Sequence, residues 1–493
     1  MYRLVLYYLI LLLCVAFIYS LFGILQFQPF SLLFSTLFLL AICWVTNKIF
    51  AAVFKAPANV ESVYISAFIL ALIIAPEKSV SDVVFLFWAG VLAMASKYIL
   101  AIKYKHLFNP VAIAVVLTAL TGVGSANWWV GTLPMLPFEL LGLLIVRKIQ
   151  RSDLVFYFFL ATLVTMFAFT IARGGDLVKV VQEVVIASSI FFCSFVMLTE
   201  PLTTPPTKKL QSLYGAFVGV LFAPQFHIGS FYTTPEIALV IGNIFSYLVS
   251  PKTKIIAKLV EKKQVSSDIF DFVFNGGKQF AFLPGQYMEW TLAHPGTDSR
   301  GNRRYFTIAS SPTEKYVRLG VRIYNHGGSS FKKALLAIPE SSQIVGAQIS
   351  GDFTLPEDKS KKLVFLAGGI GVTPFRSMIQ YLIDKDEKRS ITIFYVNKRK
   401  DEIVYDDIFN QAQKQLGIKT VYTLTDKSSV PSNWQGSVGR IDAEMIRQEV
   451  PDFRERTFYL SGPHAMVVSA EKVLQGLTIP KKQIKKDFFP GLA

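Results

Sequence analysis

The chain has 493 residues, of which 52% are hydrophobic and only 17% are charged, against roughly 25% charged residues in soluble domains. The net charge of +16 is typical of a membrane protein with basic cytoplasmic loops, and no module of interleaved aromatic and basic residues favours nucleic-acid binding. The three cysteines, Cys14, Cys43 and Cys193, stand in apolar runs, which excludes a CxxC metal site, a disulfide framework and a ferredoxin-type iron–sulfur cluster.

The first half of the chain indicates a series of membrane spans, each of about 20 apolar residues. Its first run is too long for the apolar region of a signal peptide and is followed by further hydrophobic segments, so we interpret it as a helix. We expect ten spans, at residues 4–25, 31–47, 60–76, 82–98, 108–122, 134–147, 153–171, 178–198, 211–223 and 236–250.

Basic residues alternate between the loops of this half. The loops on one side carry little more than Lys78 and Arg173. Because cytoplasmic loops are enriched in Lys and Arg, we expect a multi-pass protein of the plasma (inner) membrane, with its N-terminus and its C-terminal half in the cytoplasm. The loops expected inside carry Lys48, Lys55, Lys97, Lys103, Lys105, Arg147, Lys148, Arg151, Lys208 and Lys209.

Three expected spans, 108–122, 134–147 and 211–223, are short. Short segments mark either broken helices around an internal site or imprecise boundaries, and the sequence leaves both open. Asn109-Pro110 and Glu200-Pro201 place helix breaks in this region, where the freed backbone groups need partners. Glu200 is therefore either a functional acid or an ordinary interfacial carboxylate.

Two strings in this half carry a family resemblance. Residues 105–110 (Lys-His-Leu-Phe-Asn-Pro) and 197–207 (Met-Leu-Thr-Glu-Pro-Leu-Thr-Thr-Pro-Pro-Thr) precede Tyr214-Gly215 and Gly219. They resemble the RnfD/NqrB family, the flavin-carrying membrane proteins of two ion pumps, the Rnf complex and the sodium-translocating NADH:quinone reductase. The resemblance extends over about residues 60–250.

This resemblance implies a second flavin among the helices. Members of that family attach FMN covalently to a threonine in a Ser-Gly-Ala-Thr string, which this chain lacks; Thr121 and Thr132 lie in a similar region without that context. We therefore expect FMN or riboflavin to bind non-covalently near residues 199–207. The residues implied are Asn109, Thr199, Glu200 and Thr203.

From residue 255 the pattern changes to alternating runs such as Tyr316–Ile323, which are typical of strands. Residues 255–355 contain mostly short strands, whereas strands and helices alternate from residue 362, which indicates βαβ units and a parallel sheet. Strands are expected at 363–367, 391–396, 420–425 and 457–460, and helices at 374–383, 406–416, 442–449 and 464–477.

The fold class expected is thus a multi-domain membrane protein. A ten-helix transmembrane domain at 1–250 precedes an antiparallel β-barrel FAD domain at 251–355 and an α/β parallel-sheet NAD(P) domain at 356–493.

Five motifs in order resemble the ferredoxin–NADP⁺ reductase family over nearly all of residues 254–493. They begin with Pro284-Gly285-Gln286 and Arg304-Tyr305-Phe306-Thr307. A guanidinium pairs with diphosphate through forked hydrogen bonds, and glycines let backbone N–H groups approach the same charge. The resemblance implies that FAD contacts Arg304, Tyr305, Phe306, Thr307, Gly327, Gly328 and Ser329, with Thr307 also near the reacting flavin N5 as a catalytic residue.

The string Gly368-Gly369-Ile370-Gly371-Val372-Thr373-Pro374 follows an apolar strand and opens a helix, as a nucleotide pyrophosphate site requires. The string 461–466 resembles the family's Cys-Gly-Pro-x-x-Met, with Ser461 replacing the catalytic cysteine near the nicotinamide. The NAD(P) contacts implied are Gly368, Gly369, Gly371, Thr373, Pro374, Gly462, Pro463 and Met466.

Two details stay open in the sequence. Asn397-Lys398-Arg399-Lys400 suits a 2′-phosphate, an NAD-linked pattern or a plain solvated loop, so NADH and NADPH are not distinguished. Phe488 or Phe489 either shields the flavin, as a terminal aromatic does in many relatives, or packs in the sheet.

These features predict a membrane-bound oxidoreductase that passes electrons from NAD(P)H through FAD to a second flavin or a quinone among the helices. Expected partners are nicotinamide nucleotide, a quinone or another flavoprotein and the lipid bilayer, but no nucleic acid. A transporter or channel with a redox-sensing reductase is the alternative. A haem reductase needs four His inside the spans, but His106, His227, His294, His326 and His464 all lie outside them.

Overall fold

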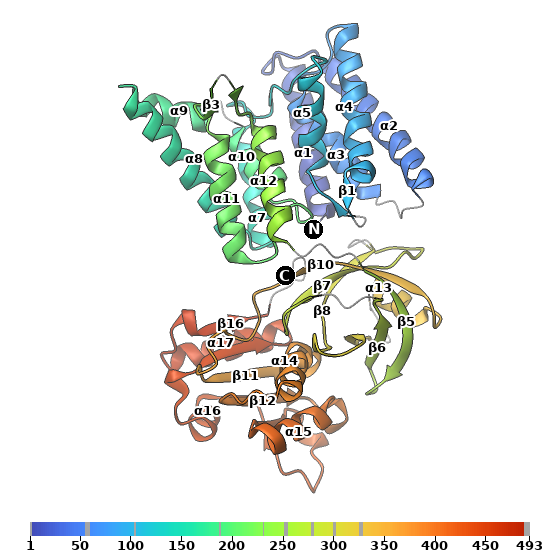
Figure 1. Cartoon of the computed structure of the whole chain (residues 1–493), viewed down its shortest axis with the longest axis vertical. Coiled ribbons are helices and arrows are strands. Elements are labelled where there is room, and N and C mark those ends of the chain that lie inside the picture. The colour runs from blue at the N-terminus through green and yellow to red at the C-terminus, as the bar shows by residue number, and fades with distance from the viewer. Residues whose placement is uncertain are drawn as a thin grey trace. The chain divides into compact units, whose positions relative to one another are not determined.

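The computed structural model describes residues 2–54, 60–102, 105–186, 189–229, 231–250, 255–277, 281–298, 302–324 and 329–487. Two compact units divide the chain, Met1–Lys252 and Thr253–Leu492. The first unit is helical and the second is built around two sheets (Figure 1). Each unit has its own hydrophobic core.

Four described helices of the first unit, α1, α2, α4 and α8, have the length and composition to cross a membrane. The expected count of ten spans stays a prediction, because the other helices are shorter. The helices are α1 Tyr2–Leu21, α2 Pro29–Val53, α3 Val60–Ile73, α4 Val80–Ile99, α5 Pro110–Leu120, α6 Leu136–Glu139, α7 Leu143–Lys148, α8 Ser152–Ala172, α9 Leu177–Ile186, α10 Ile190–Phe192, α11 Lys208–Phe222 and α12 Pro235–Val249, and the strands are β1 Ala101–Ile102, β2 Lys105–His106, β3 His227–Ile228 and β4 Phe231–Tyr232.

Two of the segments expected as single spans are not regular α-helices along their described residues. Segment 134–147 is divided into α6, a 3-10 turn at Leu140–Gly142 and α7. Segment 178–198 contains α9 and α10, and α10 continues directly into a π-helical turn, η2, at Cys193–Met197. The 3-10 turn and the π-helical turn meet, since a Cβ atom on Gly142 would lie 2.9 Å from the Phe195 side chain. Single π-helical turns inside helices are frequent at functional sites.

The second unit begins with a six-stranded antiparallel sheet in the order β8-β7-β10-β5-β6-β9. The N–H of Ala309, just after β8, donates to the carbonyl of Arg318 in β9 at 2.9 Å, which joins the two edges as the expected barrel requires. The elements are β5 Ile255–Gln264, β6 Ile269–Asn275, β7 Tyr287–Thr291, β8 Arg303–Thr307, β9 Val317–Arg322, α13 Ser330–Ala337 and β10 Gln343–Ser350.

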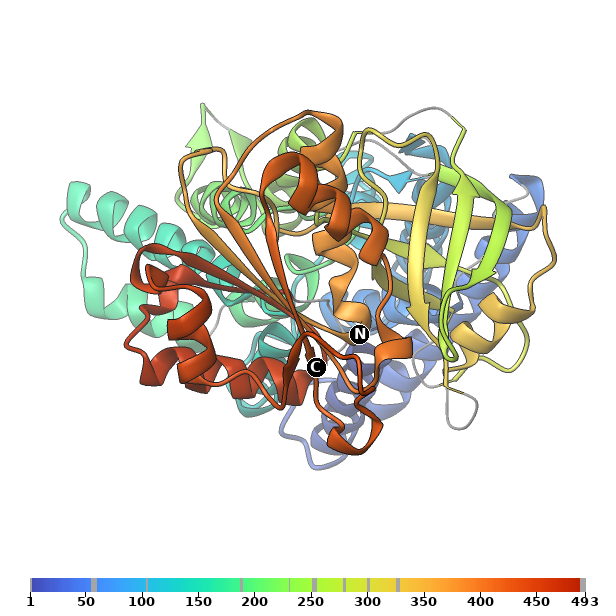
Figure 2. The same cartoon turned by 90° about the horizontal axis from the view of Figure 1, so that it is seen from below.

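A six-stranded parallel sheet follows, in the order β14-β13-β12-β11-β15-β16. Helices cover both of its faces (Figure 2). Phe365 of β11 packs with α14 and α15, whereas Val364 and Leu366 pack with α16 and α17. The expected strands and helices are confirmed within two residues: β11 Leu363–Gly368, α14 Thr373–Asp384, β12 Ile391–Asn397, α15 Asp406–Leu416, β13 Lys419–Leu424, α16 Ala443–Glu449, β15 Thr457–Ser461 and α17 His464–Gly476. Two short edge strands, β14 Ser437–Val438 and β16 Ile484–Lys486, were not expected from the sequence.

Candidate functional site

Strand β8 divides the expected flavin contacts between its two faces, because successive side chains of a strand alternate. Arg304 and Phe306 share one face and approach the Phe331 ring of α13, at 5.6 and 5.7 Å from its centroid. Tyr305 points to the other face, where its hydroxyl donates to Gln348 at 3.2 Å. The structure therefore brings Arg304 and Phe306 together but not Tyr305.

Arg304 lies beside the first turn of α13 and is paired there with Asp298. Two hydrogen bonds of 2.8 and 2.9 Å join its guanidinium to the two carboxylate oxygens. One of those oxygens also accepts the backbone N–H of Ser330 at 3.0 Å. Guanidinium and helix-start N–H groups are the donors that hold phosphates in proteins, so these residues fit a diphosphate. The sequence analysis missed Asp298, six residues before Arg304, whereas Ser330 directly follows the expected contact Ser329.

The four other expected flavin contacts have different outcomes. Ser329 caps α13, its hydroxyl accepting the N–H of Lys332 at 3.2 Å. Thr307 ends β8 and is 6% exposed, in register with Tyr287. Gly327 and Gly328 lie outside the described residues, as do Phe488 and Phe489 at the chain end.

The two glycine turns of the parallel sheet meet at its carboxyl edge. A Cβ atom on Gly371 would lie 2.6 Å from the Cα and N of Gly462, and one on Gly368 would lie 2.1 Å from the Met466 sulfur and 3.0 Å from Pro463. Strands β11 and β15 are adjacent and parallel, so both turns emerge at the same edge. Only glycine permits this backbone packing, which is the approach a dinucleotide pyrophosphate needs.

The turn after β11 leads directly into a helix. Thr373 begins α14, its hydroxyl donating to the Ile370 carbonyl at 3.1 Å, and Pro374 occupies its first turn. Arg322 of β9 approaches the same turn, its guanidinium 3.3 Å from the Cβ position of Gly369. The Arg322 guanidinium forms an ion pair with the Glu402 carboxylate, at 2.8 Å between Nη2 and Oε2. Sequence reasoning missed Arg322, which belongs to the barrel.

Ser461 ends β15 beside the glycine turns and is 3% exposed. Its hydroxyl donates to the carboxylate of Asp487 at 2.9 Å, and the N–H of Asp487 donates to Leu460 at 2.9 Å. Asp487 follows the edge strand β16 and was not expected from the sequence. The predicted catalytic hydroxyl thus has a fixed orientation and a carboxylate partner.

A buried charge cluster joins the barrel to the parallel-sheet domain. Asp271 of β6 is 2% exposed and pairs with Arg318 at 2.6 Å and with the Tyr405 hydroxyl at 3.3 Å. Burial raises the pKa of Asp271 above its usual value, and Arg318 opposes this rise. Arg376 of α14 lies 5.7 Å from the Tyr405 ring and pairs with Glu314 at 2.9 Å. These pairs fix the orientation of the glycine turns relative to β8.

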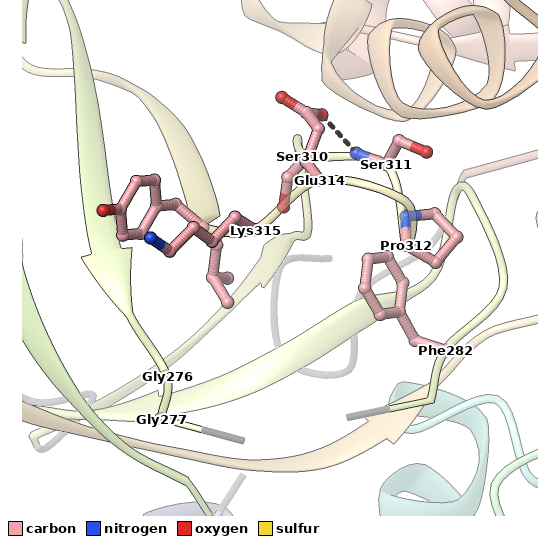
Figure 3. Close-up of a pocket in the computed structure, with 10 residues that line it drawn as sticks. Gly276, Gly277, Phe282, Ser310, Ser311, Pro312, Glu314 and Lys315 are labelled. Atoms are coloured by element: carbon pink, nitrogen blue, oxygen red, sulfur yellow. Dashed lines mark hydrogen bonds between the residues drawn. The ribbon is translucent and has the colours of Figure 1, made fainter. Parts of the chain in front are cut away.

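A small pocket of about 20 Å³ opens beside the loop after β8 (Figure 3). It has room for about one water molecule. In the close-up, the Glu314 carboxylate accepts the N–H of Ser311 across this loop, at 2.6 Å. The described residues contain no group of three His, Cys, Asp or Glu side chains that could hold a metal.

In the helical unit, Asn243 of α12 links two other segments. Its side-chain oxygen accepts the backbone N–H of Asn109 at 2.7 Å, and its amide donates to the Tyr214 hydroxyl at 3.1 Å. The Asn109 side chain in turn caps α5, accepting the N–H groups of Val111 and Ala112 at 3.1 Å. All of these polar groups are buried.

The Glu200 turn lies next to the same loop. His106 approaches Glu200 at 3.4 Å, and the Thr203 hydroxyl donates to Glu200 at 3.2 Å. The Thr199 hydroxyl donates to the carbonyl of Phe195, in the preceding π-helical turn, at 2.8 Å. The Thr199 carbonyl accepts a hydrogen bond from the Arg151 guanidinium at 3.0 Å. The structure thus brings Asn109, Thr199, Glu200 and Thr203 to one region, to which His106, Arg151, Tyr214 and Asn243 also contribute.

Comparison with known families covers the second unit. The oxidoreductase FAD-binding domain matches residues 256–350. The oxidoreductase NAD-binding domain matches residues 365–472. The second half of this chain carries FAD- and NAD-binding oxidoreductase domains of the ferredoxin–NADP⁺ reductase type. The resemblance expected for the second half is therefore confirmed, whereas the resemblance expected for the helical unit stays a prediction.

Curated relatives share this reductase half. A flavohemoprotein of Bacillus cereus is 24% identical over 245 residues, covering 48% of this chain and 60% of that protein. The NADPH nitrate reductase of Emericella nidulans is 29% identical over 289 residues, covering 52% of this chain and 33% of that protein. The chain thus spans three fifths or less of the length of these two relatives.

Solved structures align over the same half. The FAD/NAD-binding domain of nitric oxide dioxygenase from Vibrio cholerae is 20% identical with a TM-score of 0.43, covering 48% of this chain and 98% of that chain. The cytochrome b5 reductase domain of Ulva prolifera nitrate reductase is 21% identical with a TM-score of 0.42, covering the same shares.

Proposed function

We propose that this protein is a membrane-bound flavoprotein oxidoreductase that takes electrons from cytosolic NAD(P)H and delivers them, through FAD, to a second flavin or a quinone in its helical half. FAD supplies hydride acceptance at N5 and release of single electrons. Coupling of this transfer to ion transport belongs to the same proposal, supported by the resemblance of the helical half to membrane proteins of ion pumps.

The packing of Gly371 against Gly462 carries the reductase part of the proposal. It places two backbone turns and the start of α14 at one sheet edge, where a pyrophosphate meets N–H groups and the positive end of a helix. Ser461 lies beside these turns, and its hydroxyl is oriented by Asp487. Arg304 and Arg322 supply the cations that two diphosphates require.

The helical half contributes a polar region in an otherwise apolar unit. Buried polar groups inside a membrane bundle are costly and mark substrate, ion or cofactor sites. Asn109, Tyr214 and Asn243 form one such buried network, and Glu200 with His106 lies next to it. These groups suit the polar edge of an isoalloxazine or the carbonyl of a quinone, both of which exchange hydrogen bonds and protons.

Acid extraction of flavins from the purified full-length protein tests the proposal. We expect FAD plus FMN or riboflavin, or FAD alone with NAD(P)H-dependent quinone reduction. A protein with bound FAD that reduces neither a dye nor a quinone would point to the redox-sensing transporter or channel instead. The proposed electron path contains no haem, so haem bands in a reduced-minus-oxidised spectrum would contradict it.

A further inference from the structure

A carboxylate fills the position between Arg304 and the first turn of α13. Hydrogen bonds hold Asp298 there: its carboxylate accepts two from the Arg304 guanidinium at 2.8 and 2.9 Å and one from the Ser330 N–H at 3.0 Å, and its own N–H donates to the Ser330 hydroxyl at 2.9 Å. His294 also approaches the Ser330 hydroxyl, at 3.1 Å. The donor set is that of a phosphate site, and its anion is a side chain of the chain itself.

Asp298 is the partner that can leave this position. The Arg304 side chain is 10% exposed and rests over the Phe331 ring, whereas Asp298 is 26% exposed. Asp298 also follows Gly296, whose φ of +63° lies in the left-handed region that favours glycine. The guanidinium is thus held in place, and the carboxylate sits on a loop with an outlet to solvent.

We propose that Asp298 sets the affinity of this protein for FAD, because the flavin diphosphate binds by displacing the Asp298 carboxylate from Arg304 and Ser330. This inference rests on the proposed function, since it requires FAD to bind along β8 and α13. When only a fraction of the molecules has an open site, the apparent dissociation constant is the intrinsic dissociation constant divided by that fraction. Asp298 therefore weakens FAD binding in proportion to the stability of its own contacts.

Flavin titrations of the full-length protein, stripped of flavin and kept in detergent, test this competition. We expect Asp298→Asn and Asp298→Ser to lower the dissociation constant for FAD by about tenfold, since charge-assisted hydrogen bonds no longer compete. Riboflavin has no phosphate, so its dissociation constant stays unchanged. Glu289→Gln is the matched control: Glu289 pairs with the neighbouring Arg303 at 3.1 Å, and its loss leaves FAD affinity as in the wild type.

A thermal melt of the same flavin-free proteins adds a second readout. Loss of the Arg304 pair lowers the melting temperature of the Asp298 variants while FAD affinity rises, an opposition that a purely structural role does not produce. Unchanged or weaker FAD binding in both variants would show that Asp298 positions Arg304 for the cofactor, and the inference would fall. Equal tightening of riboflavin would also overturn it. Failure of the wild type to bind FAD at all would overturn the proposed function and this inference with it.

Discussion

Gly371 packs directly against Gly462: a Cβ atom on Gly371 would lie 2.6 Å from both the Cα and the N of Gly462. The neighbour is backbone, so it cannot move aside by a rotamer change. The contact joins the turns after β11 and β15 at the edge where the nicotinamide nucleotide is proposed to bind.

Gly371→Ala therefore separates the two turns. We expect a loss of about 1–3 kcal/mol of stability from overpacking, together with a higher KM for NAD(P)H in dye-reduction assays. Gly476→Ala is the matched control, because nothing lies within 4 Å of its Cβ position at the end of α17. Equal effects of both substitutions would contradict this account of the turn.

We expect Ser461 and Asp487 to act together in flavin reduction. Removing either partner of a hydrogen bond to a charged group costs about 1.5–3 kcal/mol, so Ser461→Ala and Asp487→Ala should each slow flavin reduction by about tenfold or more. Stopped-flow bleaching of the flavin by NAD(P)H measures this step. Because both changes break the same 2.9 Å contact, the double variant should be no slower than the single ones. A double variant in which the two rate losses add would argue against this joint action.

Arg322 is expected to bind the nucleotide from the barrel side. Its guanidinium lies 3.3 Å from the Cβ position of Gly369, in the turn proposed to bind the pyrophosphate. Arg322→Gln should raise KM for NAD(P)H about tenfold and change kcat less, since it removes binding common to ground and transition states. Lys419 begins β13, at the amino end of the parallel sheet, and pairs with Glu449 at 2.5 Å, so Lys419→Gln serves as the control. A loss confined to kcat would exclude this role.

Asn243→Leu tests the helical site. It removes the hydrogen bonds that Asn243 makes to the Asn109 N–H and the Tyr214 hydroxyl. Each buried group left without its partner lowers the stability by about 1–3 kcal/mol. We expect the extracted FMN or riboflavin to fall well below half while FAD is retained. Asn47→Leu is the control, since buried Asn47 accepts from Tyr98 at 2.8 Å in another part of the unit. Parallel loss of both flavins would indicate unfolding instead.

Asp271 gives a pH dependence with a defined sign. Its folded-state pKa is raised by burial above the unfolded value of about 3.9. The resulting stability is fully present below about pH 3.9 and is lost as pH rises through the folded pKa. Wild type should therefore gain stability relative to Asp271→Asn when pH falls from about 7 to about 4.5. Differential scanning fluorimetry of both proteins measures this; a difference that does not change with pH would refute it.

The strands and helices of the second half were predictable because they rest on local periodicity. Strand β11 is a short buried run, and the glycines after it precede a helix, so both the sheet and the nucleotide turn follow from a few neighbouring residues. The helical half was less predictable. Uniform hydrophobicity indicates that a segment is helical but not where its geometry changes. The 3-10 turn at Leu140–Gly142 and the π-helical turn at Cys193–Met197, which lie against each other, have no counterpart in the hydrophobicity pattern.

The sequence by itself was enough to predict FAD- and NAD-binding domains in the second half and to single out the residues proposed to carry chemistry: Arg304, the Gly368–Thr373 turn, Ser461 and the Glu200 turn. Tertiary structure alone decided their partners. Asp487 reaches Ser461 from an edge strand, Arg322 reaches Gly369 from another domain, and Asn243 reaches Asn109 from a distant helix. The physical reason is that a hydrogen bond forms over about 3 Å, and no local pattern records which remote side chain will be brought that close when the sheets and helices pack.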